Sequence, residues 1–246
     1  RQDMVQNLGG SILIYDVQAQ AAGEWVAHCT APAPLLAPEE AQDILGLTGL
    51  RHVWFDCSKS WVLPAGNTPG WYIMPQAEGW WPLEAMSQES VARLQHVYRH
   101  RATGSAPSYD VYYWSGGDLE PDIEKTLNSA ETADGRALTL PYAPNDLAIL
   151  NGYQAYDDTW VNFWEIEATP DQALSVRAHL YNTQSPPPLV DDGLGYAGEQ
   201  WQAHDTLWQR HQFPPLEGAR YLETGFYNYQ TLENIGELLR LPAAEN

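Results

Sequence analysis

The residues most able to do chemistry in this sequence are a histidine pair and two pairs of acidic residues. His96 and His100 stand four residues apart, a spacing that lets two histidines on one helix bind zinc together. A zinc protease motif requires glutamate directly after the first histidine, and Val97 occupies that position. Because the sequence signals no third ligand, we expect a packed or solvated histidine pair and no metal site.

The acidic pairs are Asp157 with Asp158 and Asp191 with Asp192. Loop carboxylates can bind calcium, but neither pair has the alternating aspartates and closing glutamate of an EF-hand loop. The chain contains 32 acidic residues, so adjacent pairs arise by chance, and aspartate is common in turns. We therefore interpret both pairs as turn formers. A glycosidase would need carboxylates that meet only in the fold, so a hydrolase is the less favoured alternative.

Motifs for nucleophilic catalysis and phosphate binding are lacking. The sequence contains neither a Gly-x-Ser-x-Gly elbow nor a Walker loop. Gly9 and Gly10 precede the first apolar segment instead of following it, so they cannot place a phosphate at a helix N-terminus. We predict no catalytic residue and no cofactor in this chain. Whether it belongs to an enzyme stays open.

Tryptophan supplies the candidate binding residues, since the chain contains 11 of them. Trp71, Trp80 and Trp81 flank a predicted turn, where exposed indole rings could stack on sugar rings or contact a partner. A domain interface is the alternative for these three residues. Other tryptophans, such as Trp54 and Trp160, have the spacing of core residues.

The two cysteines, Cys29 and Cys57, are too few for a disulfide scaffold and lack the spacing of zinc or redox sites. Each lies in or beside an apolar segment, so the two could meet on neighbouring strands. Two alternatives remain open at this point. One is a disulfide, which suits an oxidising compartment, and the other is a pair of buried free thiols.

The charge of the chain limits its partners. Its 246 residues carry a formal net charge of −20, and Lys59 and Lys125 are its only lysines. Such a surface repels phosphate backbones and anionic lipids, so we expect no nucleic acid partner. No apolar run reaches the roughly 18–20 residues that a membrane-spanning helix needs. The chain opens at Arg1 and not at methionine, which suggests a processed product or a piece of something longer.

Residues 1–84 predict a small α/β domain. The apolar residues 11–17 favour a buried strand, whereas residues 38–45 begin acidic and become apolar, as a short helix does. Strand-like segments separated by Gly, Pro and Asn turns follow at residues 52–56, 60–64 and 70–75.

Residues 85–135 predict a bridge between two domains. Ser87 is a suitable N-cap for a helix that ends near residue 101. One face of that helix would carry Val91, Leu94, Val97 and Tyr98. Residues 109–114 predict a strand, and the acidic stretch 118–136 has the composition of a linker.

Residues 136–246 predict an antiparallel β-sandwich. Residues 174–181 alternate between apolar and polar side chains, as in a strand with one buried and one solvated face, and residues 221–229 do so again. Further strand-like segments lie at residues 148–150, 160–166 and 206–213, and the prolines at 186–188 are among the turn signals between strands. The expected fold class is therefore mainly β, with a jelly-roll or Ig-like sandwich preceded by a small α/β domain.

Six segments of this last part follow one another in a set order. They are Leu150-Asn151-Gly152-Tyr153, residues 160–164, His179-Leu180-Tyr181, Asp192-Gly193, residues 201–205, and Arg220-Tyr221 with Gly225-Phe226-Tyr227. The series resembles the C-terminal extracytoplasmic sandwich of bacterial membrane glycosyltransferases of the dolichyl-phosphate-mannose protein mannosyltransferase type. Residues 54–56, 61–65 and 112–114 resemble the segment after the last membrane helix of those proteins. His204 departs from the pattern, because a glycine usually follows the loop tryptophan.

The resemblance implies a non-catalytic, soluble, extracytoplasmic accessory domain of a membrane glycosyltransferase that uses lipid-linked sugar donors. In that family the catalytic acidic residues lie near the first membrane helices, so none would fall in this chain. The implied partners are the membrane-embedded portion, other subunits of a cell-surface complex, and glycans. The alternative is a secreted or cell-surface module for carbohydrate binding or structural assembly. Both place the chain outside the cytoplasm, with any membrane tether supplied by sequence beyond this chain.

Overall fold

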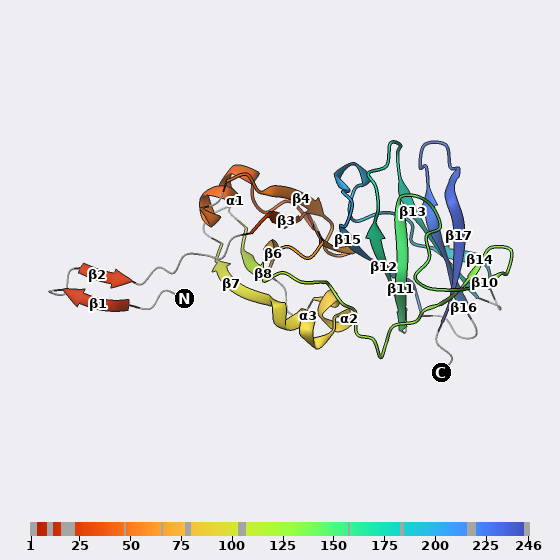
Figure 1. Cartoon of the computed structure of the whole chain (residues 1–246), viewed down its shortest axis with the longest axis horizontal. Coiled ribbons are helices and arrows are strands. Elements are labelled where there is room, and N and C mark those ends of the chain that lie inside the picture. Colours follow the sequence, from red (N-terminus) through yellow and green to blue (C-terminus); the bar gives the residue numbers. More distant parts are fainter. Residues whose placement is uncertain are drawn as a thin grey trace.

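The computed structural model describes residues 4–8, 12–15, 23–46, 48–64, 66–76, 80–102, 107–156, 158–182, 185–215 and 220–243. The chain is mainly β, with an α/β part, an antiparallel β-sandwich and a separate β-hairpin (Figure 1). The fold class predicted from the sequence is therefore confirmed. In the part of the chain that the structure describes, no helix has the length and apolar character needed to cross a membrane.

The α/β part is built on a mixed sheet with the strand order β4-β3-β6-β8-β7. Its strands are β3 (Trp25–Cys29), β4 (Arg51–Phe55), β6 (Gly70–Pro75), β7 (Leu94–His100) and β8 (Tyr109–Trp114). β3 runs parallel to both of its neighbours, whereas β8 is antiparallel to β6 and β7. Helix α1 (Pro38–Leu45) forms the crossover that the parallel pair β3 and β4 requires.

Helix α1 forms where its sequence predicted it. Glu39 and Glu40 lie in its first turn, and the Glu40 carboxylate accepts a hydrogen bond from the Ala37 N–H at 3.0 Å. Gly46, with φ of 65°, ends the helix in the left-handed conformation that glycine adopts readily. Ala41 and Leu45 are buried with Trp71 in a small cluster on one face of the sheet.

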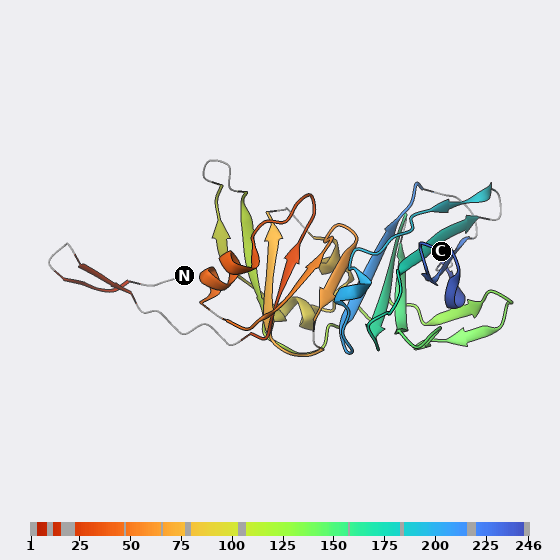
Figure 2. The same ribbon diagram turned by 90° about the horizontal axis from the view of Figure 1, so that it is seen from above.

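The first predicted strand lies elsewhere. β2 (Ile12–Tyr15) pairs only with β1 (Met4–Leu8), and this hairpin lies apart from the five-stranded sheet in both views (Figures 1 and 2). Residues 11, 16 and 17 of the predicted strand are outside the described residues. The α/β sheet instead begins with β3, which is buried over all five residues.

The predicted bridging helix is correct only in its first half. The chain forms the short helices α2 (Trp81–Ala85) and α3 (Gln88–Arg93), and Ser87 caps α3 by accepting the Ser90 N–H at 3.1 Å. The expected continuation to residue 101 is wrong, because Leu94–His100 pairs with β8 as strand β7. Tertiary pairing outweighs the local helical pattern here, and Val97 and Tyr98 favour strands.

This correction separates the two histidines. Four residues span roughly 13 Å along a strand, so His96 and His100 do not share one metal in the way a helical pair can. The Nε2 atom of His96 lies 3.1 Å from a carboxylate oxygen of Asp110, which also binds Arg99 at 2.7 Å. The His100 ring stacks on Tyr109, with centroids 4.7 Å apart.

Two sheets form the sandwich. The four-stranded sheet has the order β11 (Ala148–Tyr156), β12 (Thr159–Ile166), β15 (Thr206–Gln212), β5 (Ser60–Leu63). The six-stranded sheet has the order β10 (Ala137–Thr139), β9 (Ser129–Thr132), β17 (Asn234–Pro242), β16 (Arg220–Tyr227), β13 (Ser175–Asn182), β14 (Ser185–Val190). A short 3-10 helix, η1 (Gly198–Gln200), precedes β15. Val176, Ala178 and Leu180 are buried on β13, which confirms the predicted alternation.

Two strands of the sandwich come from before residue 136. β9 lies within the stretch 118–136 that was predicted to be a linker, and β5 comes from the α/β part. The three prolines at residues 186–188, predicted to form a turn, instead lie in β14. Since β14 is an edge strand, it can lack N–H donors on its unpaired side, which is where sheets tolerate proline.

Strand β5 joins the two parts of the molecule. It pairs with β15 in the register Trp61 to Trp208 and Val62 to Leu207. The α/β part consequently lies against the outer face of the four-stranded sheet (Figure 2). A buried ion pair adds to this contact, since Arg51 on β4 donates to both carboxylate oxygens of Asp205, at 2.5 and 2.7 Å.

We predict that Arg51→Met destabilises the fold by about 3–5 kcal/mol, because it leaves the Asp205 carboxylate buried without its cation. The Asp205 side chain is 0% exposed, so water cannot replace the guanidinium. Urea unfolding monitored by tryptophan fluorescence measures the change. Lys125→Met is the matched control, since Lys125 pairs with Asp122 at the surface and should cost at most about 1 kcal/mol. Equal losses in the two variants would contradict the role given to Arg51.

Candidate functional site

A cavity of about 300 Å³ lies beside the carboxyl ends of the parallel strands β3, β4 and β6. We call it the aromatic pocket. It is lined by Ala31, Cys57, Ser58, Trp61, Met74, Pro75, Trp80, Trp81, Pro82 and Arg210. Open α/β sheets bind ligands outside the carboxyl ends of their strands, where the strand order reverses. The volume is at the lower end of the range of about 300–1,000 Å³ for small-molecule sites.

Three tryptophans line the apolar side of the aromatic pocket, and two of them have accessible rings. Trp61 on β5 is fully buried, and its ring centroid lies 5.8 Å from that of Trp80. Trp80 also contacts the ring of Tyr112 on β8, at 4.8 Å between centroids. Trp80 and Trp81 are only half-buried, so part of each indole is accessible. Partly exposed aromatic rings beside a cavity can stack on a ligand ring.

The disulfide between Cys29 and Cys57 holds one side of the pocket. It joins the end of β3 to the loop after β4 and closes a loop between residues 28 positions apart. The backbone carbonyl of Cys57 accepts a hydrogen bond from the indole N–H of Trp81 at 2.9 Å. The orientation of the Trp81 ring is thereby tied to the covalent link. Of the two alternatives that the sequence left open, the structure contains the disulfide.

Arg210 on β15 brings a positive charge to the pocket. Its Cζ lies 5.9 Å from the centroid of the Trp81 ring, a cation–π contact. The side chain is half-buried, and its Nε is buried without a hydrogen-bond partner. Within the described ranges, no carboxylate lies within ion-pair distance of Arg210.

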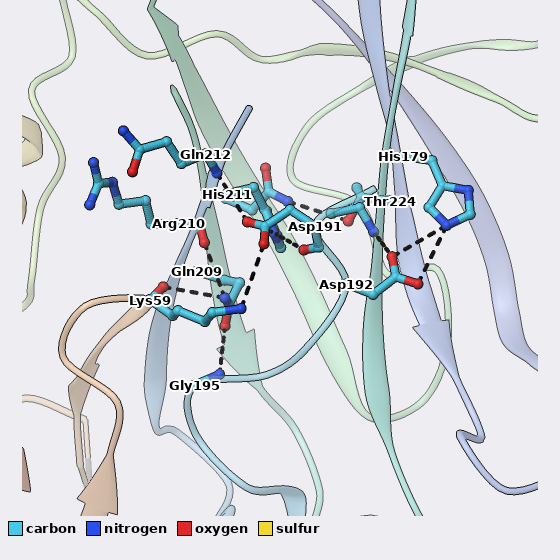
Figure 3. A network of polar contacts seen from close by, with 12 residues as sticks. Lys59, His179, Asp191, Asp192, Gly195, Gln209, Arg210, His211, Gln212 and Thr224 are labelled. Carbon is cyan, nitrogen blue, oxygen red and sulfur yellow. Dashed lines mark hydrogen bonds and ion pairs between the residues drawn. The ribbon is translucent and has the colours of Figure 1, made fainter. Parts of the chain in front are cut away.

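A polar network fixes the strand that carries Arg210 (Figure 3). The backbone N–H of Arg210 donates to the Lys59 carbonyl at 2.7 Å, and Gln209 Nε2 donates to the same carbonyl at 3.2 Å. Gln209 Oε1 accepts from the Ser60 hydroxyl at 2.7 Å and from the Gly195 N–H at 3.2 Å. The Arg210 side chain points away from this network in Figure 3. The network therefore holds the Arg210 backbone but does not contact the guanidinium.

Asp191 completes the network at the end of β15. Its carboxylate accepts the Gln212 N–H at 3.0 Å and lies 3.6 Å from Lys59 Nζ and 3.7 Å from His211 Nδ1. Burial acts to raise the pKa of Asp191, but the contact with His211, the hydrogen bond from the Gln212 N–H and the charge of Lys59 lower it to about 2. Asp191 is therefore ionised through almost the whole accessible pH range.

The predicted role of the acidic pairs as turn formers is too limited for Asp191 and Asp192. Asp192 accepts the Ala178 N–H at 2.7 Å and lies 3.3 Å from His179, so the pair links the loop after β14 to both sheets. Asp157 is outside the described residues. Asp158 lies in the turn before β12, where its backbone carbonyl accepts the Phe213 N–H at 2.8 Å.

The structure brings together two of the three tryptophans predicted to contact a ligand. Trp80 and Trp81 line the aromatic pocket, but Trp71 is 2% exposed and lies in the cluster with α1. The prediction for Trp71 is wrong because it points to the face of β6 that the helix covers. The sequence analysis did not identify Arg210 as a site residue. An arginine within a predicted strand of so acidic a chain could have indicated it.

A second cavity of about 450 Å³ lies on the same side of the sandwich. Asp118, Glu165 and His204 are among its polar residues. Its aromatic residues Phe163, Trp164 and Trp208 are at most 3% exposed, so they offer almost no ring surface to a ligand there. We therefore place the candidate site at the aromatic pocket.

The prediction that the chain has no phosphate-binding motif overlooked one run of glycines. Residues 193–198 read Gly-Leu-Gly-Tyr-Ala-Gly, which matches Gly-x-Gly-x-x-Gly. They follow the antiparallel edge strand β14 and lead into η1, which has only three residues. A dinucleotide site requires a parallel strand before this motif and a full helix after it, so the match is fortuitous.

No family model, curated protein or solved structure matches the chain. The chemistry of the aromatic pocket is consequently inferred from its own residues. Its described lining contains neither a carboxylate nor a histidine, the side chains that most often act as general acid or base. Ser58 carries the one hydroxyl, which donates to Asp56 at 2.5 Å and has no adjacent histidine to activate it. The arrangement is suited to binding.

We predict that Asp191 makes stability depend on pH in acid. Its folded pKa of about 2 is below the ordinary value of 3.8, so its contribution is complete above pH 4 and is lost between pH 4 and pH 2. The contribution is at most about 2 kcal/mol, because solvent screens a carboxylate that is only partly buried. Urea unfolding at pH 6, 4 and 2.5 should show a smaller acid-induced loss for Asp191→Asn than for the wild type. Asp146→Asn, at an exposed position, is the control and should follow the wild type.

Proposed function

We propose that this chain is a non-catalytic extracytoplasmic module that binds carbohydrate, with one sugar ring in the aromatic pocket. The observation that carries the proposal is the pair of half-buried indoles, Trp80 and Trp81, beside a cavity sized for a small ring. Sugar rings present C–H faces that pack on aromatic surfaces, and tryptophan offers the largest such surface. The lack of an acid–base pair in the described lining favours binding over hydrolysis.

The disulfide supports the location. Disulfides persist in oxidising compartments and are rare in the cytosol, and Cys29–Cys57 lies directly beside the pocket. A module that depends on this link would be most stable outside the cytoplasm, where extracellular glycans are found.

A second candidate is the accessory domain of a membrane glycosyltransferase that uses lipid-linked sugar donors. What favours it is the order of the six segments that resemble that family. Four of them lie in the sandwich strands β11, β12, β13 and β16, and the other two lie in the loops after β14 and before β15. The two candidates are compatible, since an accessory domain could hold an acceptor glycan in the aromatic pocket.

The gene sequence upstream of Arg1 tests the second candidate. Several membrane-spanning helices encoded in the same reading frame are expected if the chain is a domain of such an enzyme. A short frame that encodes only a secretion signal would rule it out, while leaving the carbohydrate-binding proposal intact.

We predict that Trp81→Ala and Trp80→Ala each weaken glycan binding by at least about fivefold, because each removes an aromatic stacking surface. A glycan array identifies the ligand, and titration calorimetry measures the affinity. Trp54→Ala is the matched control, since Trp54 is also half-buried in the α/β part but is not part of the pocket lining. Thermal unfolding monitors the fold of each variant. Absence of wild-type binding across a broad array would refute the proposal.

A further inference from the structure

We infer that the sugar held in the aromatic pocket carries a carboxylate, so that its ligand class is the acidic sugars of the uronic acid type. The inference rests on the proposed function and adds the charge of the ligand. It is carried by the position of Arg210, which lines the pocket, lies over Trp81 and has no carboxylate partner in the described residues.

The isolation of Arg210 is unusual for this chain. With 32 acidic and 12 basic residues, most cations have a carboxylate within reach. Arg51, Lys59 and Arg99, for example, each lie within 3.6 Å of an aspartate oxygen. A half-buried cation without a carboxylate in direct contact among the described residues has lost part of its hydration without gaining an ion pair there. An anionic ligand would supply that counter-charge.

The chemistry of the guanidinium favours a planar anion. Arginine can donate two parallel N–H bonds to the two oxygens of one carboxylate, and such charge-assisted bonds are stronger than neutral ones. The Nε of Arg210 is buried and has no acceptor among the described residues. A ligand carboxylate would therefore bind the terminal Nη atoms of the guanidinium, because the side chain is only half-buried.

A singly charged group fits this site better than a phosphate. Arg210 is the only cation in the described lining, and Lys59, the nearest lysine in the network, is paired with Asp191. Arg210 also shares its surroundings with acidic groups. Burial raises the pKa of Tyr156, while Arg210 lowers it and both Glu84 and Asp158 raise it, so these three charges all act on one hydroxyl. Two nearby carboxylates repel any anionic ligand, but they repel a dianion about twice as strongly as a singly charged carboxylate.

The other lining residues of the aromatic pocket can contact the uncharged ring of the ligand. Trp80, Trp81 and Met74 are apolar surfaces in the same 300 Å³ cavity as the guanidinium. A pyranose ring packed against the indoles would therefore keep a substituent carboxylate within reach of Arg210. Neutral sugars would fill the cavity but leave the cation unpaired.

The test compares methyl β-D-glucuronide with methyl β-D-glucoside, which differ at one carbon, by ligand-detected NMR and calorimetry at low and high salt. The wild type should bind the glucuronide about tenfold more tightly, and this preference should shrink at high salt. Arg210→Gln should abolish the preference by lowering glucuronide affinity to that of the glucoside, whereas Arg210→Lys should keep part of the preference. Arg136→Gln is the control, because Arg136, like Arg210, lies over an aromatic ring, that of Tyr142, but is outside the pocket.

The outcomes separate the two proposals. Equal affinity for both glycosides, with binding still lost in Trp81→Ala, would overturn the carboxylate inference and support carbohydrate binding. Tighter binding of glucose 6-phosphate than of the glucuronide would also overturn it. Binding of neither glycoside, nor of any acidic or neutral glycan on the array, would refute the proposed function itself. If Arg210→Gln does not fold, the glucuronide preference of the wild type and its salt dependence still decide the matter.

Discussion

The pairing of β5 with β15 is the constraint on which the rest of the structure depends. β5 belongs to the α/β part by sequence, yet its backbone hydrogen bonds complete the four-stranded sheet of the sandwich. Because a strand cannot leave its sheet without giving up these bonds, the two parts form one continuous hydrophobic core. The ion pair of Arg51 and Asp205 strengthens a contact that the backbone has already fixed.

The aromatic pocket is a consequence of this joint. Its walls come from the ends of parallel strands in one part and from β15 in the other, so neither part alone contains the whole site. Trp61 is brought in by β5 and Arg210 by β15, while the disulfide holds Cys57 and, through its carbonyl, the Trp81 indole. Pre-organised rings lose little conformational entropy when a ligand binds, which favours affinity from a small contact area.

The sequence predicted features that depend on local pattern and missed those that depend on distant pairing. Alternation identified β13 because one of its faces is buried between the sheets and the other is not. The same method failed at β7, an edge strand whose residues have helical spacing, and at β9, which is only four residues long and lies within an acidic stretch. It predicted exposed indoles at Trp80 and Trp81, which are half-buried, but it could not show that α1 covers Trp71.

Arg210 lies at the edge of the apolar interface between the α/β part and the four-stranded sheet, where a charged side chain is tolerated. Trp208 and Arg210 are two residues apart on β15, so they lie on the same outer face and are separated by about 7 Å. Trp208 is 1% exposed, whereas Arg210 is half-buried. The cover provided by the α/β part therefore ends between them. β15 therefore carries an apolar residue, Trp208, where the α/β part covers it and a charged residue, Arg210, where that cover ends. The aromatic pocket lies at the edge of the covered region.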